Sequence, residues 1–94
     1  MGNYTIRKYT YDRAKKMGVK VRPSRNKTKK IDVINRAGKI VAQVGANGMN
    51  DYPTFIATRG LEYANKRRKL YKQRHEKDRH IRGTPGYYAD KLLW

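Results

Sequence analysis

The 94-residue sequence contains no cysteine. Disulfide bonds, thiolate zinc ligands and cysteine nucleophiles are therefore excluded together. No apolar run approaches the ~20 residues that a membrane-spanning helix needs. No apolar stretch follows Met1, so we expect no secretory signal peptide. These absences predict a protein that stays inside the cell, or that is enclosed in a particle made there.

Acidic residues are also scarce. Seven Asp and Glu stand against 24 Lys and Arg, which gives a formal net charge of +17. The positive charge falls in two blocks, residues 7–39 and 59–82, with a nearly uncharged segment, residues 40–58, between them. Eight Tyr, one Trp and one Phe are enough to seed a compact core, and the length allows one small domain. The composition predicts a single basic domain, residues 1–94, that meets a polyanion.

The first third of the chain predicts a short helix, a strand and a polar loop. Apolar residues recur every three or four positions across Tyr9–Met17, with Tyr9 or Tyr11, then Ala14 and Met17, on the side expected to be buried. Gly18 stands where a helix C-terminal glycine is expected. Val19–Arg22 alternates apolar and polar residues, which predicts a strand that Pro23 ends. Residues 24–30 are too polar to pack and predict a loop.

A β-hairpin is the strongest structural signal. Ile31–Ile34 and Lys39–Val44 are rich in β-branched residues, and Asn35–Gly38 between them supplies a turn with glycine at its tight position. These segments predict two antiparallel strands.

The second half predicts helices. Asp51 or Tyr52 would cap a helix with Pro53 in its first turn, and Gly60 would interrupt it. The stretch Leu61–His80 predicts one long, strongly basic helix with a narrow apolar seam.

The last eight residues are unusually apolar and predict a terminus that docks on another surface. Together the segments predict a small α+β domain. Its antiparallel sheet has two or three strands, and a short N-terminal helix and a long basic C-terminal helix pack on one face. Tyr87, Tyr88, Leu92 and Trp94 would close that face.

Two clusters of cations are candidate phosphate contacts. Cations three and four residues apart on the basic helix repel one another. A bound polyanion would relieve this repulsion, and each phosphate that the helix neutralised would release condensed counterions and so favour binding. A loop needs only charge and reach to contact phosphate. The alternatives are a solvated helix face and a flexible, solubilising loop. The candidate nucleic-acid-binding residues are Lys66, Arg67, Arg68, Lys69, Lys72 and Arg74 on the helix, and Arg22, Arg25, Lys27, Lys29 and Lys30 in the loop.

Most of the tyrosines are interleaved with Lys and Arg. Such surfaces stack on unpaired bases in single-strand binders. A domain with one Phe and one Trp, however, has to build its core largely from tyrosine. We expect most tyrosines in the core, and stacking on bases is the alternative.

The sequence shows no catalytic or metal-binding pattern. His75-Glu76 begins a zinc-protease motif, but the second histidine, His80, is one residue too far along and is rotated ~100° past the position that would share a metal. No nucleophile–base pair stands out. We therefore expect no enzyme activity, no metal and no cofactor.

A series of short strings runs through the C-terminal half. The strings are Asp51-Tyr52-Pro53, Arg67-Arg68-x-x-Tyr71-x-x-Arg74-His75-x-x-Asp78, Gly86-Tyr87-Tyr88 and Leu92-Leu93-Trp94. With them, the chain resembles small basic proteins encoded by large double-stranded DNA viruses of algae and protists, over roughly residues 31–94. The resemblance carries over no active site; it implies a viral setting, in the virion or inside the infected cell.

The same strings also have a structural interpretation. The spacing from Arg67 to Asp78 would place these groups on one side of a helix, which could pack on the terminal Leu-Leu-Trp with Asp78 paired to an arginine. DNA would then be bound by Lys66, Lys69, Lys72 and the loop.

Two functions follow. The first is non-enzymatic, largely sequence-independent binding of nucleic acid, in particular condensation or packaging of duplex DNA, through Lys and Arg contacts to phosphate. The second is a minor capsid or cementing protein that binds other virion proteins. The apolar terminus distinguishes them, because deleting residues 86–94 would abolish assembly but spare DNA binding. Its candidate protein-interaction residues are Tyr87, Tyr88, Leu92, Leu93 and Trp94.

Overall fold

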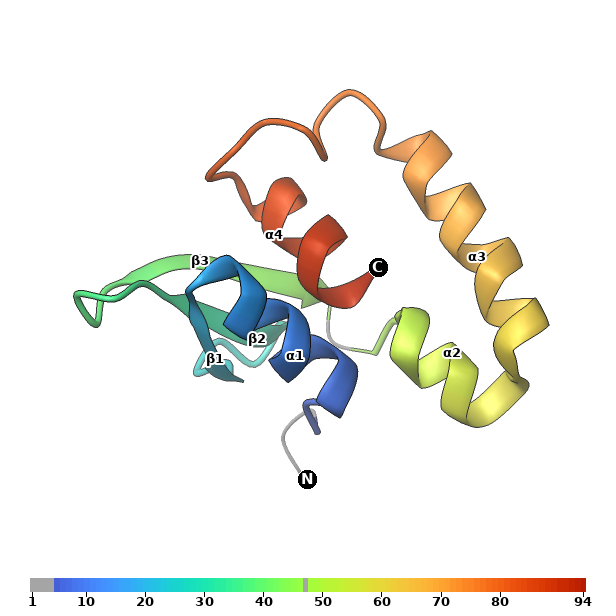
Figure 1. The fold of residues 1–94 in the computed structure, drawn as a ribbon, viewed down its shortest axis with the longest axis horizontal. Coiled ribbons are helices and arrows are strands. Elements are labelled where there is room, and N and C mark those ends of the chain that lie inside the picture. Colours follow the sequence, from blue (N-terminus) through green and yellow to red (C-terminus); the bar gives the residue numbers. More distant parts are fainter. Residues whose placement is uncertain (1–4, 47) are drawn as a thin grey trace.

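A computed structural model describes residues 5–46 and 48–94 and confirms the predicted α+β class. Within this part of the chain, a three-stranded antiparallel sheet is accompanied by four helices (Figure 1). None of these helices is long and apolar enough to cross a membrane. In chain order the elements are α1 (Lys8–Met17), β1 (Lys20–Pro23), β2 (Lys29–Ile34), β3 (Ile40–Ala46), α2 (Tyr52–Arg59), α3 (Leu61–Arg74) and α4 (Pro85–Leu93).

Helix α1 is confirmed and begins one residue earlier than predicted. Gly18 ends it with φ 75°, and the Gly18 N–H donates back to the last turn, so the chain reverses directly into β1. The buried side is formed by Thr10 and Ala14. Tyr11, one of the two residues expected on that side, is 49% exposed.

The hairpin is confirmed. Strands β2 and β3 pair antiparallel, and β1 pairs with the other edge of β2, so the order is β1-β2-β3. In the turn, the Asn35 side chain accepts hydrogen bonds from the backbone N–H groups of Ala37 and Lys39. Strand β2 begins at Lys29, so the predicted loop is shorter and residues 29 and 30 belong to the sheet.

Helix α2 starts as predicted and α3 ends early. The Asp51 side chain accepts a hydrogen bond from the Thr54 N–H, which caps α2, and Gly60 with φ 93° separates α2 from α3. The prediction of one helix to residue 80 was wrong, because α3 has 14 residues and stops at Arg74. Beyond it the backbone closes short turns, with the Asp78 N–H donating to the His75 carbonyl. The long basic C-terminal helix is therefore not confirmed.

The apolar tail is itself a helix, which was not predicted. Thr84 caps α4 through the Tyr87 N–H, and Pro85 occupies its first turn, a common start signal. Leu92 and Leu93 are almost wholly buried, and so is most of Trp94. The surface on which this terminus docks is the protein's own core.

The core lies between the sheet, α1 and α4, and extends along α2 and α3 as a row of aromatic rings. Ile31, Val33 and Val44 of the sheet are buried against this core. At Gly45, a Cβ would lie 2.7 Å from Leu93 Cδ1, so only glycine lets α4 approach β3 this closely. The Trp94 ring stacks on Tyr71, with centroids 4.4 Å apart and planes 8° from parallel.

The buried C-terminus predicts a stability difference between two identical substitutions. Leu92→Ala, at a fully buried position, should lower the free energy of unfolding by roughly 2–5 kcal/mol because it leaves a cavity. Leu70→Ala, at a position 50% exposed on α3, should cost far less. Urea denaturation measures both. Equal losses would mean that α4 is not part of the core.

Candidate nucleic-acid interface

Helix α3 has an inner side that is bound to the rest of the protein. Ala64 and Tyr71 on this side are buried. The Arg68 guanidinium lies over the Tyr52 ring, 4.8 Å from its centroid, and the Arg67 guanidinium lies 5.6 Å from the Phe55 centroid. Both arginines were predicted phosphate contacts. They are half-buried, and they hold α3 on α2.

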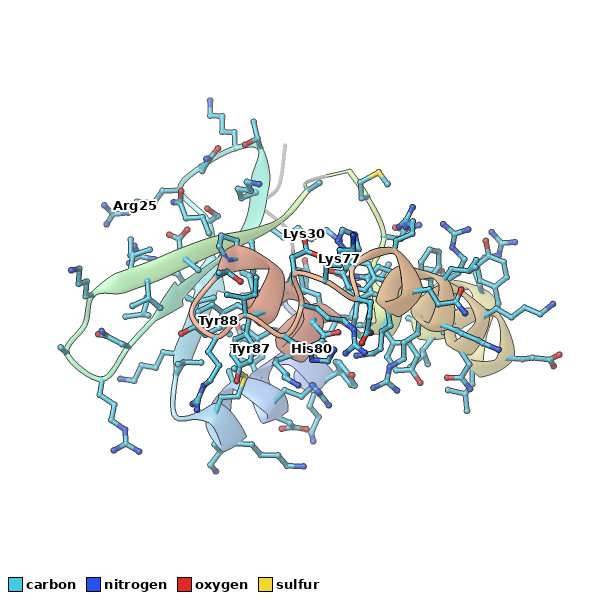
Figure 2. All side chains as sticks on the ribbon, turned by 90° about the horizontal axis from the view of Figure 1, so that it is seen from above. Arg25, Lys30, Lys77, His80, Tyr87 and Tyr88 are labelled. Carbon is cyan, nitrogen blue, oxygen red and sulfur yellow. The ribbon has the colours of Figure 1, made fainter. Side chains whose placement is uncertain are left out.

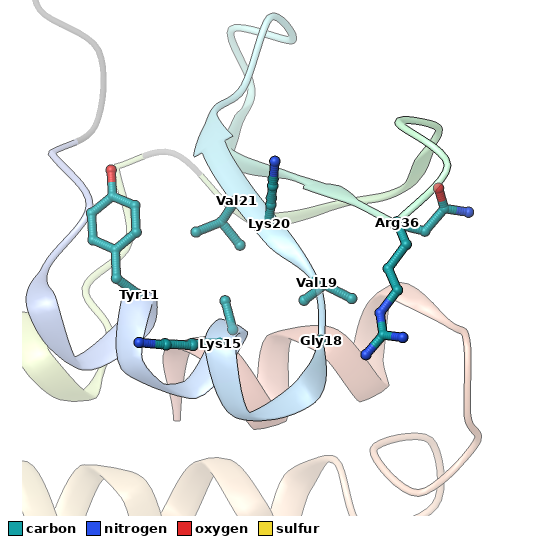
Figure 3. A pocket seen from close by; sticks show the side chains of 9 residues that line it. Tyr11, Lys15, Gly18, Val19, Lys20, Val21 and Arg36 are labelled. Atoms are coloured by element: carbon teal, nitrogen blue, oxygen red, sulfur yellow. The ribbon is translucent and has the colours of Figure 1, made fainter.

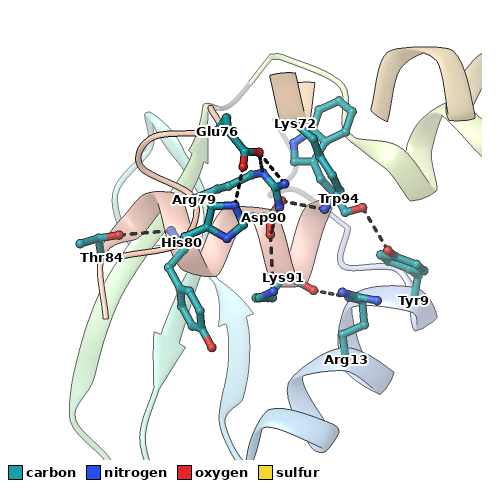
Figure 4. Close-up of polar contacts among 11 residues, drawn as sticks. Tyr9, Arg13, Lys72, Glu76, Arg79, His80, Thr84, Asp90, Lys91 and Trp94 are labelled. Atoms are coloured by element: carbon teal, nitrogen blue, oxygen red, sulfur yellow. Dashed lines mark hydrogen bonds and ion pairs between the residues drawn. The ribbon is translucent and has the colours of Figure 1, made fainter. Parts of the chain in front are cut away.

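Lys72, another predicted phosphate contact, forms an internal ion pair. Its ammonium lies 2.7 Å from Asp90 Oδ1, and the Asp90 side chain is only 1% exposed (Figure 4). Arg79 lies 3.5 Å from the other carboxylate oxygen and also bonds to Glu76. Lys72 therefore joins α3 to α4 and is not presented to a phosphate.

Asp90 stays ionised at the centre of this group. Burial opposes its charge, but the hydrogen bond and charge of Lys72, together with Arg79 and Lys91, outweigh burial and lower the pKa of Asp90. The neighbouring Tyr71 responds in the opposite direction. Its burial, reinforced by the negative charge of Asp90, raises the pKa of Tyr71 to about 12.

The structural interpretation of the Arg67-to-Asp78 string is confirmed in part. Tyr71 does pack on the terminal Trp94, as that interpretation required. The expected partner of Asp78 was wrong, because its carboxylate faces His75 Nδ1 at 3.6 Å, and Arg79 pairs with Glu76 and Asp90 instead.

The outer side of α3 keeps its cations exposed. Lys66 and Lys69 lie one turn apart there and are exposed, as are Gln73 on the next turn and Arg74 at the helix end. Of the six candidate residues on α3, these three cations are the ones that solvent reaches most fully.

The second predicted cluster divides in the same way. Arg25 and Lys27 are exposed in the turn between β1 and β2. Lys29 is half-buried in β2, and Lys30 is only 3% exposed, with its ammonium 2.9 Å from Asp51. The prediction that Lys30 contacts phosphate was wrong, because its charge faces inward to a buried carboxylate.

Arg22, the remaining loop candidate, helps to enclose Asp32. Its Nε donates to the carboxylate at 3.3 Å, and Ser24 and Gln43 donate at 2.6 and 3.0 Å. Burial would raise the pKa of Asp32. These hydrogen bonds, with one from the Arg25 N–H, outweigh burial and lower the pKa.

The two clusters do not form one patch. Arg25 lies toward the sheet end of the molecule, whereas α3 lies at the opposite end of the long axis (Figure 1, Figure 2).

The scarce acids are placed largely inside. Asp32, Asp51 and Asp90 are three of the seven acidic residues, and none is more than 1% exposed. Each is paired with a cation, so the net charge of +17 is carried by the surface. The exposed acids are Asp12, Glu62, Glu76 and Asp78, and the exposed cations are Lys8, Lys15, Lys16, Lys20, Arg25, Lys27, Arg36, Lys39, Arg59, Lys66, Lys69, Arg74, Lys77 and Arg82.

A further group of residues around α1 was not predicted from the sequence. Lys15, Lys20 and Arg36 are among the residues that line a groove between α1 and β1, with Tyr11 on its wall and the Lys20 side chain directed away from α1 (Figure 3). The signal was Gly18, because a left-handed glycine between a helix and a strand folds the two elements side by side.

Each histidine lies beside an acidic side chain of its own segment. His80 pairs with Glu76 at 3.0 Å, and His75 pairs with Asp78. Among the described residues, no group of three His, Asp or Glu side chains lies close enough to hold a metal ion.

Comparison of the chain with protein-family models, curated proteins and solved structures found no match. The resemblance to viral proteins therefore stays a prediction.

The internal ion pair predicts a large effect of Asp90→Asn. The substitution leaves Lys72 half-buried without its negative partner and should lower the free energy of unfolding by roughly 2–4 kcal/mol. Glu76→Gln is the matched control, because Glu76 bonds to the same arginine but is exposed, and it should change stability little. Urea denaturation at pH 7 compares them, and equal effects would contradict the importance of burial.

The lowered pKa values of Asp32 and Asp90 also predict acid lability. Below about pH 4 these carboxylates bind protons in the unfolded chain but stay ionised in the folded protein. Their contribution to the free energy of unfolding is therefore complete above that pH and decreases as the pH falls further. Denaturation curves from pH 7 to 3 measure the loss. In Asp90→Asn the decline should be shallower, and an unchanged decline would exclude Asp90 as a source.

Proposed function

We propose that this protein is a non-enzymatic nucleic-acid-binding protein that contacts phosphates through Lys and Arg with little regard to base sequence. Its proposed ligand is duplex DNA, which it would condense or package. The proposed setting in a virus particle comes from the sequence resemblance alone.

The distribution of charge is the observation that supports this proposal most strongly. Buried acids neutralise inward-facing cations, so the exposed surface is dominated by Lys and Arg. A surface of this kind gains free energy from a polyanion, because each phosphate that it neutralises releases condensed counterions.

The character of the exposed cations favours contact with phosphate over reading of bases. Lys66 and Lys69 are flexible point charges, which suit phosphates but impose no fixed donor geometry. Arginines form the bidentate contacts typical of base reading. On α3, Arg67 and Arg68 are held against the rings of α2, which leaves Arg74 at the helix end as the exposed arginine of this helix. Binding should therefore vary little with sequence.

The placement of the two clusters favours condensation. Helix α3, which carries Lys66 and Lys69, lies toward one end of the molecule, and Arg25 lies toward the other. A protein with cations at both ends neutralises two neighbouring segments of duplex at once. That geometry brings segments together, whereas a single groove would bind only one.

The alternative function, binding to virion proteins through the apolar terminus, is not supported by the position of that terminus. Leu92, Leu93 and Trp94 are buried in the core, and Tyr87 and Tyr88 are half-buried. Deleting residues 86–94 would remove core residues, so the deletion cannot separate the two functions.

The decisive measurement is binding to a random-sequence duplex across a salt series. Six phosphate contacts would lower the affinity by roughly 10³ between 50 and 200 mM salt. Lys66→Ala with Lys69→Ala should reduce the log–log slope by about 1.8, at ~0.9 per lost contact. Gln73→Ala, an uncharged change on the same side of α3, is the control and should leave the slope unchanged.

Weak or salt-insensitive binding of the unmodified protein at 50 mM salt would overturn the proposed function. An unchanged slope in the double variant would instead exclude the outer side of α3 as a contact surface.

A further inference from the structure

A groove of about 500 Å³ lies between α1 and β1 (Figure 3). Its volume is within the range of small-molecule sites. Ala14, Val19 and Val21 give it an apolar wall, with Tyr11 toward one end and Arg36 toward the other. The groove takes no part in the contacts on α3 described above.

Tyr11 is the tyrosine that the fold does not use. Every other tyrosine in the described part of the chain contacts another aromatic ring. Tyr11 is 49% exposed and has neither a ring contact nor a side-chain hydrogen bond among those residues. A face of this ring is therefore available to a planar group.

The charge around the groove is of one sign. Lys15, Lys20 and Arg36 are exposed on its lining, and no acidic residue of the described chain lines it. Arg36 reaches across from the hairpin turn, since a Cβ on Gly18 would lie 3.3 Å from its guanidinium. A ligand that fits has an apolar or aromatic part and at least one negative charge.

An acidic peptide added as a further strand fits this groove poorly. β1 is an edge strand, and the Ser24 N–H donates to the Lys30 carbonyl of β2. In an antiparallel pair, alternate residues point their backbone N–H and C=O groups at the neighbouring strand. Val21 and Pro23 are therefore the residues of β1 whose backbone groups face the open edge. Pro23 has no N–H, and the Val19 N–H already donates to Ala14. Within β1 only Val21 offers an outward N–H, and strand addition needs a row of them.

We infer that this groove binds an unpaired nucleotide of a single-stranded nucleic acid. The base stacks on Tyr11 beside the apolar wall, and Lys15 and Arg36 neutralise the adjoining phosphates. A stacking platform beside a cationic path is the arrangement by which proteins bind single strands without sequence preference. The inference rests on the proposed function and adds to it a site that requires an unpaired base.

The test compares a short oligothymidylate, an abasic strand of the same length and a random duplex, each with the full chain at fixed salt. Tyr11→Ala should weaken oligothymidylate binding roughly tenfold, a typical loss for one stacked base. It should leave abasic-strand and duplex binding unchanged. Tyr11→Phe keeps the stacking face and should bind oligothymidylate like the unmodified protein.

The control is the Lys66→Ala, Lys69→Ala variant, which should weaken strands and duplex alike. Circular dichroism confirms that each variant is folded. The inference would be overturned if Tyr11→Ala weakened binding of oligothymidylate and of the abasic strand equally, or weakened neither. Duplex binding that stayed intact in the same variant would still support the proposed function. A competition experiment gives a further test, in which polyglutamate or unlabelled oligothymidylate displaces labelled oligothymidylate. If polyglutamate displaced it more strongly, and Tyr11→Ala removed that advantage, the groove would be a peptide site and the inference would be overturned.

Discussion

Helix α4 is held between α1, α3 and β3, and its side chains and terminal carbonyls join these elements. Thr10 of α1 donates to the Leu92 carbonyl at 2.8 Å, and the Arg13 guanidinium donates to the Lys91 carbonyl. The Asp90 carboxylate forms an ion pair with the Lys72 ammonium of α3. The contact with β3 is the close approach at Gly45. Because a buried carboxylate without its cation is costly, the position of α3 depends on this helix.

The placement of the charges has a single physical origin. An unpaired cation destabilises a protein most strongly in the interior, so in a domain with few acids the carboxylates are needed most beside the buried cations. The three buried carboxylates therefore fix Lys30, Lys72 and Arg22 in place. The exposed Lys and Arg side chains repel one another, and counterions or a polyanion compensate their charge.

Local signals predicted much of the fold. The Asn35–Gly38 turn and the Asp51 cap depend on residues close in sequence, so the hairpin and the start of α2 followed from the sequence. The candidate site was predicted less well. Lys30 and Lys72 look like surface cations in any window of the sequence, and their carboxylates come from distant segments. Tyr11 differs from the packed Tyr9 only in which side of α1 it occupies, and the spacing along this short helix left that choice open.

The bonds between α1 and α4 join the two ends of the described chain. The Tyr9 hydroxyl and the Trp94 carbonyl are 85 residues apart in sequence, and Thr10 and Leu92 are 82 apart. Contacts of such separation close long loops, and the entropy lost in closing them slows folding. During synthesis the core therefore stays incomplete until residues 90–94 have emerged from the ribosome. Until those residues are free to dock, a segment rich in Lys and Arg stays without its complete core beside the anionic RNA of the ribosome.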